Sequence, residues 1–335
     1  MLLALNSAAH LLVDGLCAAT IFGQLSGAGG DLLLLYNTLA FSTQCLVGLA
    51  ADRLRRHPAA ACVSMLLIVC GWALPLPPAV RIVLIGLGNS AFHVAGGCMT
   101  LERSGGRAGK LGVFVAPGAV GLTLGTLWPG LGAVFAAGLA LCAAAVIPVA
   151  ARAPKEVNIT QPREAPAPGM LIPVLLTLAV AVRAVGGSAV SFPWKATGTL
   201  TLLTTLCVFA GKTAGGFVCD RLGARNTALL SILPAAVLIA FCARWMLPSL
   251  IGQFALNLTM PVTLWLLYRA MPDAPGFAFG LAASALWPGT LAGQLMTLTG
   301  PALWLCVIAS FGFGLCAILY SERKVLRKTK EEIRT

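Results

Sequence analysis

The stretch Gly48-Leu-Ala-Ala-Asp52-Arg53-Leu54 recurs later in the chain as Gly216-Phe-Val-Cys-Asp220-Arg221-Leu222, displaced by 168 residues. Three further pairs share this displacement: Asn89 with Asn257, Val94 with Val262, and Gly112 with Gly280. Pro117-Gly118 recurs at a displacement of 171, as Pro288-Gly289. One repeat could arise by chance, but several at nearly one displacement indicate a duplication. The chain is therefore predicted to consist of two similar halves.

The composition is that of a membrane protein. Only 10% of the 335 residues are charged, 58% are apolar, and the mean hydropathy is +0.90. A soluble domain of this length could not bury so much apolar surface, whereas lipid would solvate it. The long apolar run Leu111–Ala151 excludes a soluble protein with unusually large cores.

Twelve apolar segments of about 20 residues are predicted to span the membrane as helices. They are 2–23, 31–51, 59–76, 79–101, 111–130 and 131–151, then 170–190, 197–219, 227–244, 248–269, 276–297 and 299–320. We therefore expect an all-α integral membrane protein with two pseudo-symmetric six-helix halves. The halves are 1–151 and 169–320, joined by a polar linker at 152–168 and followed by a basic tail at 321–335.

Positive charge is concentrated on one side of these spans. Of the 23 Lys and Arg residues, 18 lie in the connections after the even-numbered spans and in the C-terminal tail. Because basic loops remain in the cytoplasm, both termini and the linker are expected on the cytoplasmic side. The protein is expected to be a multi-pass protein of the bacterial inner membrane. The net charge of +12 thus reflects topology and does not indicate a nucleic-acid partner.

The two copies of the motif resemble the signature of the major facilitator superfamily, which lies between spans 2 and 3 and between spans 8 and 9. Within that superfamily the chain most resembles the fosmidomycin-resistance branch of efflux proteins. This resemblance rests on His10-x-x-x-Asp14, Gly86-x-Gly88-Asn-Ser-Ala-Phe92-His93, Ala116-Pro117-Gly118-x-x-Gly121, and Arg183 followed by Phe192-Pro193. It covers nearly the whole chain and implies the major facilitator fold.

Five acidic, basic or imidazole side chains lie well inside the predicted spans, away from the span ends, where each costs several kcal/mol and is a functional candidate. They are His10, Asp14, His93, Arg183 and Lys212. His10 and Asp14 share one helical face, as do Asn89 and His93. We expect Asp14 and Arg183 to face each other across the halves, as a proton-coupling switch or as a static pair.

Two of these residues leave alternatives open. His93 could carry a proton or be a neutral hydrogen-bonding group. Lys212 could line the inner vestibule or snorkel to the surface. If Arg183 and Lys212 both face a cavity with Asp14, that cavity is positive and takes an anionic or zwitterionic substrate. Asn257, the counterpart of Asn89, is assigned to the same site.

Two motifs are expected to serve conformational change. The resemblance implies that Asp52 and Asp220 engage neighbouring helix ends and basic loop residues and so hold a cytoplasmic gate. The gating residues are Gly48, Asp52, Arg53, Gly216, Asp220 and Arg221; the alternative is that the loop arginines only set topology. Gly112, Pro117, Gly118 and Gly121 resemble the span-5 motif of antiporters, although small residues at this spacing also serve ordinary close packing.

The sequence therefore predicts a monomeric transporter that moves a small, anionic organic compound by proton-coupled alternating access, as an efflux antiporter. The alternatives are a proton symporter that imports an organic acid, and a non-transporting receptor or scaffold on the same fold. No nucleophile–base pair and no Cys/His ligand spacing is present, so we expect no enzyme, no cofactor and no metal site. The eleven cysteines lie in apolar stretches and indicate no disulfide framework.

Overall fold

The computed structural model describes residues 1–27, 29–153 and 170–332, and these residues form helices and turns without a strand. The first half contains α1 (Leu2–Ala19), the π-helical turn η1 (Thr20–Gln24), α2 (Gly30–Asn37), the π-helical turn η2 (Thr38–Ser42), α3 (Gln44–Leu54), α4 (His57–Ala73), α5 (Pro78–Glu102), α6 (Gly109–Val115), α7 (Pro117–Leu127), the 3₁₀ turn η3 (Pro129–Leu131) and α8 (Gly132–Arg152). The second half contains α9 (Leu171–Ser188), α10 (Gly198–Cys242), α11 (Met246–Asn257), α12 (Thr259–Ala270), α13 (Pro275–Leu295) and α14 (Gly300–Glu332).

These elements account for the twelve predicted spans. Nine helical stretches in the described part of the chain are long and apolar enough to cross a membrane. One of them, α10, contains two spans, because Gly223 has φ 80° and ψ 164° and breaks the helix between them. The shorter apolar helix α4 and the helix α13 complete the set. The prediction of an all-α fold with about twelve membrane-spanning helices is confirmed.

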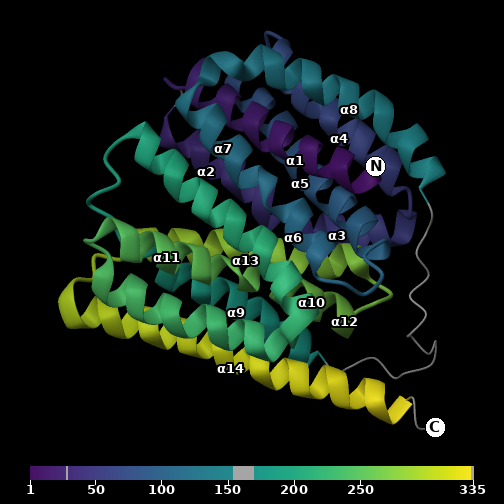
Figure 1. The fold of residues 1–335 in the computed structure, drawn as a ribbon. Coiled ribbons are helices and arrows are strands. Elements are labelled where there is room, and N and C mark those ends of the chain that lie inside the picture. The colour runs from purple at the N-terminus through teal and green to yellow at the C-terminus, as the bar shows by residue number, and fades with distance from the viewer. Residues whose placement is uncertain (28, 154–169, 333–335) are drawn as a thin grey trace.

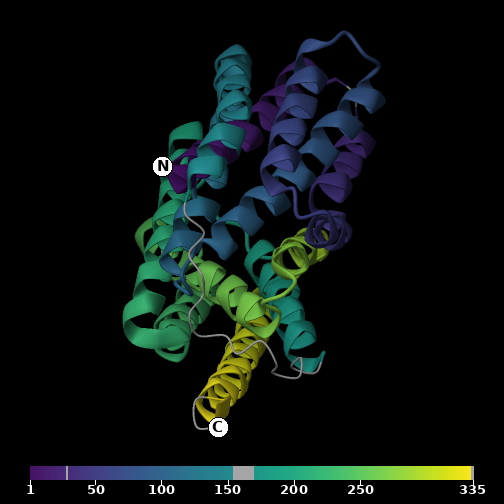
Figure 2. The same ribbon diagram turned by 90° about the vertical axis from the view of Figure 1, so that its right-hand side faces the viewer.

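The two halves form separate groups of helices. Figure 1 shows the first half, in purple to teal, above the second half, which runs from teal at α9 to yellow at α14, and Figure 2 shows the same division after a quarter turn. The N-terminus and the end of α14 lie toward the same end of the bundle (Figure 1). An even number of crossings in each half explains this placement.

The halves meet through glycines at equivalent positions. A Cβ at Gly48 would overlap the backbone of Gly276, and a Cβ at Gly216 would overlap the backbone of Ala108 and Gly109. Likewise Gly112 packs against the carbonyl of Lys212, and Gly280 packs against the carbonyl of Gln44. The same two contacts are thus made twice, at the displacement of the sequence repeat. Small residues allow helix backbones to approach this closely in a membrane.

The predicted motif residue Gly121 offers a test of this packing within the first half. A Cβ at Gly121 would overlap the carbonyl of Leu11, because α7 lies directly against α1. Gly121→Ala is therefore expected to destabilise the protein by roughly 1–3 kcal/mol, the usual cost of overpacking. The matched control is Gly312→Ala, where nothing lies within 4 Å of the added atom. Thermal unfolding in detergent measures both, and equal midpoints for the two variants would contradict the close packing of α1 and α7.

Candidate functional site

A cavity of about 210 Å³ lies between the two halves. Most of its wall is apolar, and both halves contribute to it. Its polar lining residues are His10, Asp14, Gln44, His93, Lys212 and Thr263. The cavity therefore brings together four of the five ionisable residues that the sequence placed inside the spans.

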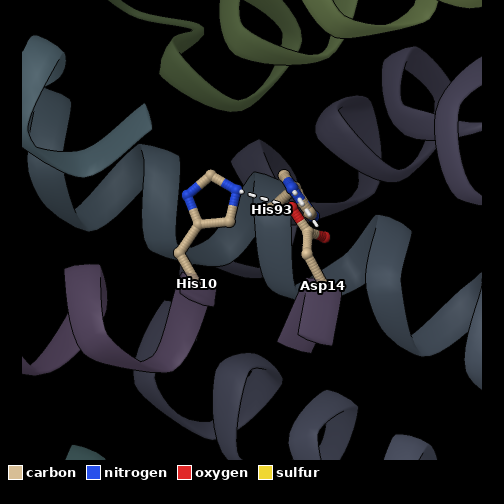
Figure 3. Close-up of side chains that lie close together, drawn as sticks. All are labelled: His10, Asp14 and His93. Carbon is tan, nitrogen blue, oxygen red and sulfur yellow. Dashed lines mark ion pairs between the residues drawn. The ribbon is translucent and has the colours of Figure 1, made fainter. Parts of the chain in front are cut away.

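A carboxylate between two imidazoles forms the centre of the polar wall. His10 and Asp14 lie one turn apart on α1, and His93 reaches them from α5 (Figure 3). The distance from His10 Nε2 to Asp14 Oδ2 is 3.4 Å, and that from His93 Nε2 to Asp14 Oδ1 is 3.7 Å. Asn89 Nδ2 donates a hydrogen bond of 2.9 Å to Asp14 Oδ1. We call His10, Asp14 and His93 the carboxylate–imidazole cluster.

The hydrogen bonds of Nδ1 in His10 and in His93 fix the tautomer of each imidazole ring. His10 Nδ1 is 2.7 Å from the carbonyl oxygen of Phe114, and His93 Nδ1 is 2.9 Å from that of Asn89. A carbonyl oxygen only accepts, so each Nδ1 carries a hydrogen. Each Nε2 therefore presents either a second proton or a lone pair to the carboxylate. Because a lone pair facing a carboxylate is unfavourable, this arrangement favours a cation between the rings and Asp14.

Both a proton and a metal ion fit that requirement. The ligand atoms of the cluster all lie within 4.8 Å of one another, which is close enough to share one ion. An ion site was not predicted here, because the ligands come from two helices and follow no Cys/His spacing; Asp14 and His93 are 79 residues apart in the chain. The geometry of the cluster is thus compatible with holding a proton or a metal ion within a largely apolar cavity.

The predicted pair between Asp14 and Arg183 is not formed. Arg183 is buried in α9, and its Nη1 donates to Thr259 Oγ1 at 2.6 Å and to Thr263 Oγ1 at 3.5 Å. These hydroxyls belong to the same half as Arg183, so the guanidinium is held within that half. Arg183 therefore lies behind the cavity wall and contacts the lining residue Thr263.

Lys212 supplies the positive charge in the cavity instead. It lines the cavity, so of the two alternatives it does not snorkel to the surface. Within the part of the chain that the structure describes, its ammonium makes no hydrogen bond or ion pair. It lines the same cavity as Asp14 and His93, so its charge acts on both of them. An unpaired ammonium in a largely apolar cavity is available to an anion.

Gln44 is a site residue that sequence reasoning missed. It lies 168 residues before Lys212, so it occupies the equivalent position in the first half. Its side chain is fully buried, and its Oε1 has no hydrogen-bond partner among the described residues. The repeat could have revealed it.

Asn257, in contrast, was expected in the site but donates to Gln253 O of its own helix and does not line the cavity.

Two equivalent contacts, which we call the clasps, join the halves at one end of the cavity. Asp52 accepts hydrogen bonds from the backbone N–H groups of Gly276 and Phe277, at 2.7 and 2.8 Å. Asp220 accepts from Ala108 and Gly109, at 2.7 and 3.0 Å. Each carboxylate thus caps the N-terminus of a helix in the other half, where the helix dipole also favours it. Arg53 and Arg221 are exposed.

Aromatic residues also join the two halves. The rings of Phe114 and Phe279, one from each half, lie 6.0 Å apart, and Trp265 Nε1 donates to Gly106 O at 2.7 Å. The span-5 motif completes the wall. Pro117 separates α6 from α7, and Gly118 packs against His10 and Asp14, where any Cβ would overlap both. The motif therefore makes room for the carboxylate–imidazole cluster.

Comparison with known proteins shows similarity at the level of structure. No protein-family profile and no curated protein matches the sequence. A crystal structure of a variant of the Escherichia coli fucose:proton symporter FucP matches with a TM-score of 0.67 and 12% identity, covering 95% of this chain and 98% of that one. A crystal structure of the major facilitator superfamily transporter FucP in the outward conformation matches with a TM-score of 0.65, at the same identity and coverage. The predicted fosmidomycin-resistance branch receives no support at this level. The chain has the all-α fold of major facilitator superfamily transporters.

Proposed function

We propose that this protein is a proton-coupled secondary transporter that moves a small organic anion by alternating access, as an efflux antiporter. The observation that carries the proposal is the composition of the cavity between the halves. It holds the ammonium of Lys212, which has no partner among the described residues, together with a carboxylate that two imidazoles flank. Charges cost several kcal/mol in a membrane, and this cost argues against a receptor or scaffold that makes no use of them.

The two sites are close enough to be coupled. An anion at Lys212 and a proton on the carboxylate–imidazole cluster change the charge of the same cavity. Occupancy of one site therefore alters the free energy of occupying the other. For antiport, release of the anion must favour uptake of the proton; for symport, the two must bind together. The span-5 motif supports antiport. Symport is the second candidate, because by charge alone an anion beside Lys212 favours protonation of the cluster, and because the fold is shared with a fucose:proton symporter.

The clasps suggest the conformation and the orientation. We propose that they form the cytoplasmic gate, in agreement with the positive charge of the adjoining loops. In this structure the gate is then closed and the cavity belongs to an outward-type state, as in the second matching structure. The proposal includes cytoplasmic termini, halves at 1–151 and 169–320, and a monomer in the bacterial inner membrane.

Proton movement in proteoliposomes tests the function. The purified protein is reconstituted with a pH-sensitive dye inside, and short carboxylates and phosphonates are added outside, each beside its neutral ester. We expect an internal pH change with some anions and none with their esters, and none in protein-free vesicles. Internal alkalinisation indicates antiport of the entering anion against protons, and acidification indicates symport. The absence of anion-dependent proton movement across a broad panel would contradict the proposal.

A further inference from the structure

A second cavity, of about 350 Å³, lies at one end of the first half and shares no lining residue with the first. It lies where α3 ends, α4 begins, and α5 and α8 end. Its charged and imidazole lining residues are Arg55, His57, Glu102 and Arg103. Because four helix ends meet here, the pocket is at the depth where spans leave the membrane.

The pocket contains polar groups whose hydrogen-bonding capacity is not used. His57 is 5% exposed; its Nε2 lies 3.2 Å from Glu102 Oε1, but its Nδ1 is buried without a partner among the described residues. Arg103 Nη1 lies 3.6 Å from Glu102 Oε2, and its Nε is likewise buried without a described partner. A buried polar atom without a partner is costly, so these two nitrogens favour a ligand that offers hydrogen-bond acceptors.

The local charge favours an anion as this ligand. Arg55, at the exposed rim, and Arg103 line the pocket together with Glu102, so the lining contains two guanidinium groups and one carboxylate. His57 is also the first residue of α4, a helix of 17 residues, whose N-terminal N–H groups carry partial positive charge. With a proton on each ring nitrogen, His57 would donate to Glu102 on one side and to the anion on the other. Phosphate oxygens suit such a set of donors, because arginine matches them in a fork geometry.

The surroundings identify the source of the phosphate. Ile147 on α8 lines the pocket and is 49% exposed, and its neighbour in the lining, Ala151, is exposed as well. The basic residues of the pocket therefore adjoin an exposed apolar face of α8, which the acyl chains of a lipid would cover. We propose that this pocket binds the phosphate group of an anionic membrane lipid. Basic pockets between membrane helices at this depth commonly hold lipid headgroups.

The pocket adjoins the segment that carries Asp52, the carboxylate of one of the two clasps. Asp52 and Arg55 belong to the same chain segment, at the end of α3. A phosphate held by Arg55 and His57 fixes this segment between α3 and α4. Lipid binding thus stabilises the part of the first half that presents Asp52 to α13. The inference requires the membrane fold, and it holds whether or not the protein transports an anion.

Lipid binding to the purified protein tests the proposal. Native mass spectrometry in detergent measures the affinity for phosphatidylglycerol, for phosphatidylcholine, and for soluble glycerol phosphate. We expect phosphatidylglycerol to bind most tightly, because Arg55 and Arg103 repel the choline cation. Glycerol phosphate should bind much more weakly, because it lacks the acyl chains. Equal affinity for both lipids would overturn an anion-selective site, and equal affinity for glycerol phosphate would overturn the lipid as its source.

Variants locate the site. Arg55→Gln is the main variant, because Arg55 is exposed and its loss should not affect folding. We expect it to weaken phosphatidylglycerol binding about tenfold, the effect of one charge-assisted contact. Arg55→Gln with Arg103→Gln should weaken it further. The matched control is Arg107→Gln, an exposed arginine of the next loop that does not line the pocket. Wild-type affinity in Arg55→Gln, or an equal loss in Arg107→Gln, would overturn the assignment.

Discussion

Proteoliposomes with the Asp14→Asn variant are expected to equilibrate the transported anion without concentrating it. In the wild type, one proton per anion and a pH gradient of one unit supply about 1.4 kcal/mol, which corresponds to roughly tenfold accumulation. Asparagine keeps the size of the side chain and an oxygen that can accept from Asn89. It removes the carboxylate that stabilises an added proton on His10 or His93. The accumulation ratio, measured with a labelled anion, should fall to about one.

The control for this prediction is Asp31→Asn, an exposed carboxylate in the first turn of α2 that does not line the cavity. This variant should accumulate the anion as the wild type does. Thermal unfolding of both variants shows whether they are folded. Wild-type accumulation by Asp14→Asn would place the coupling proton outside the carboxylate–imidazole cluster.

The fold could be predicted from the sequence because its main determinants are local or repeated. Apolar length predicted the spans, and the displaced motif predicted two halves with equivalent contacts. The breaks within spans were not predictable in the same way. The segment 30–54 reads as one apolar helix, but the structure interrupts it at η2. There Ser284 of the other half donates to the carbonyls of Phe41 and Ser42. A break that depends on a partner 242 residues or more away in the chain leaves no local signal.

The site was recovered in part, and the difference has a physical cause. Helical spacing placed His10 with Asp14 and Asn89 with His93, and a cost argument selected Lys212; the structure brings all five together or close to one another. Arg183 is just as costly to place inside a membrane, but it lies outside the cavity lining. The rotation of α9 about its axis decides which way Arg183 faces, and spacing within one helix does not fix it. Its partners, Thr259 and Thr263, are unremarkable in a sequence.

Lys212→Gln is expected to weaken the binding of an anionic substrate at equilibrium by roughly 10- to 100-fold, the usual effect of losing a hydrogen bond to a charged group. The ammonium lines the cavity and has no partner in the described part of the chain, so an anion can use it fully. The neutral ester of the same compound should bind the variant and the wild type equally. The measurement is the dissociation constant of a carboxylate or phosphonate and of its ester, by calorimetry on purified protein.

Two further variants distinguish this role from that of other basic residues. Arg183→Gln should weaken anion binding less than Lys212→Gln, because Arg183 acts only through Thr259 and Thr263. It should also weaken the ester, since those hydroxyls support the cavity wall for both ligands. Lys195→Gln, in the loop before α10, removes a lysine that does not line the cavity and should leave both affinities unchanged. If Arg183→Gln loses anion binding selectively while Lys212→Gln keeps it, the substrate's negative charge is held by the guanidinium. The cavity must then rearrange on binding, so that Arg183 leaves its threonines and comes to face Asp14.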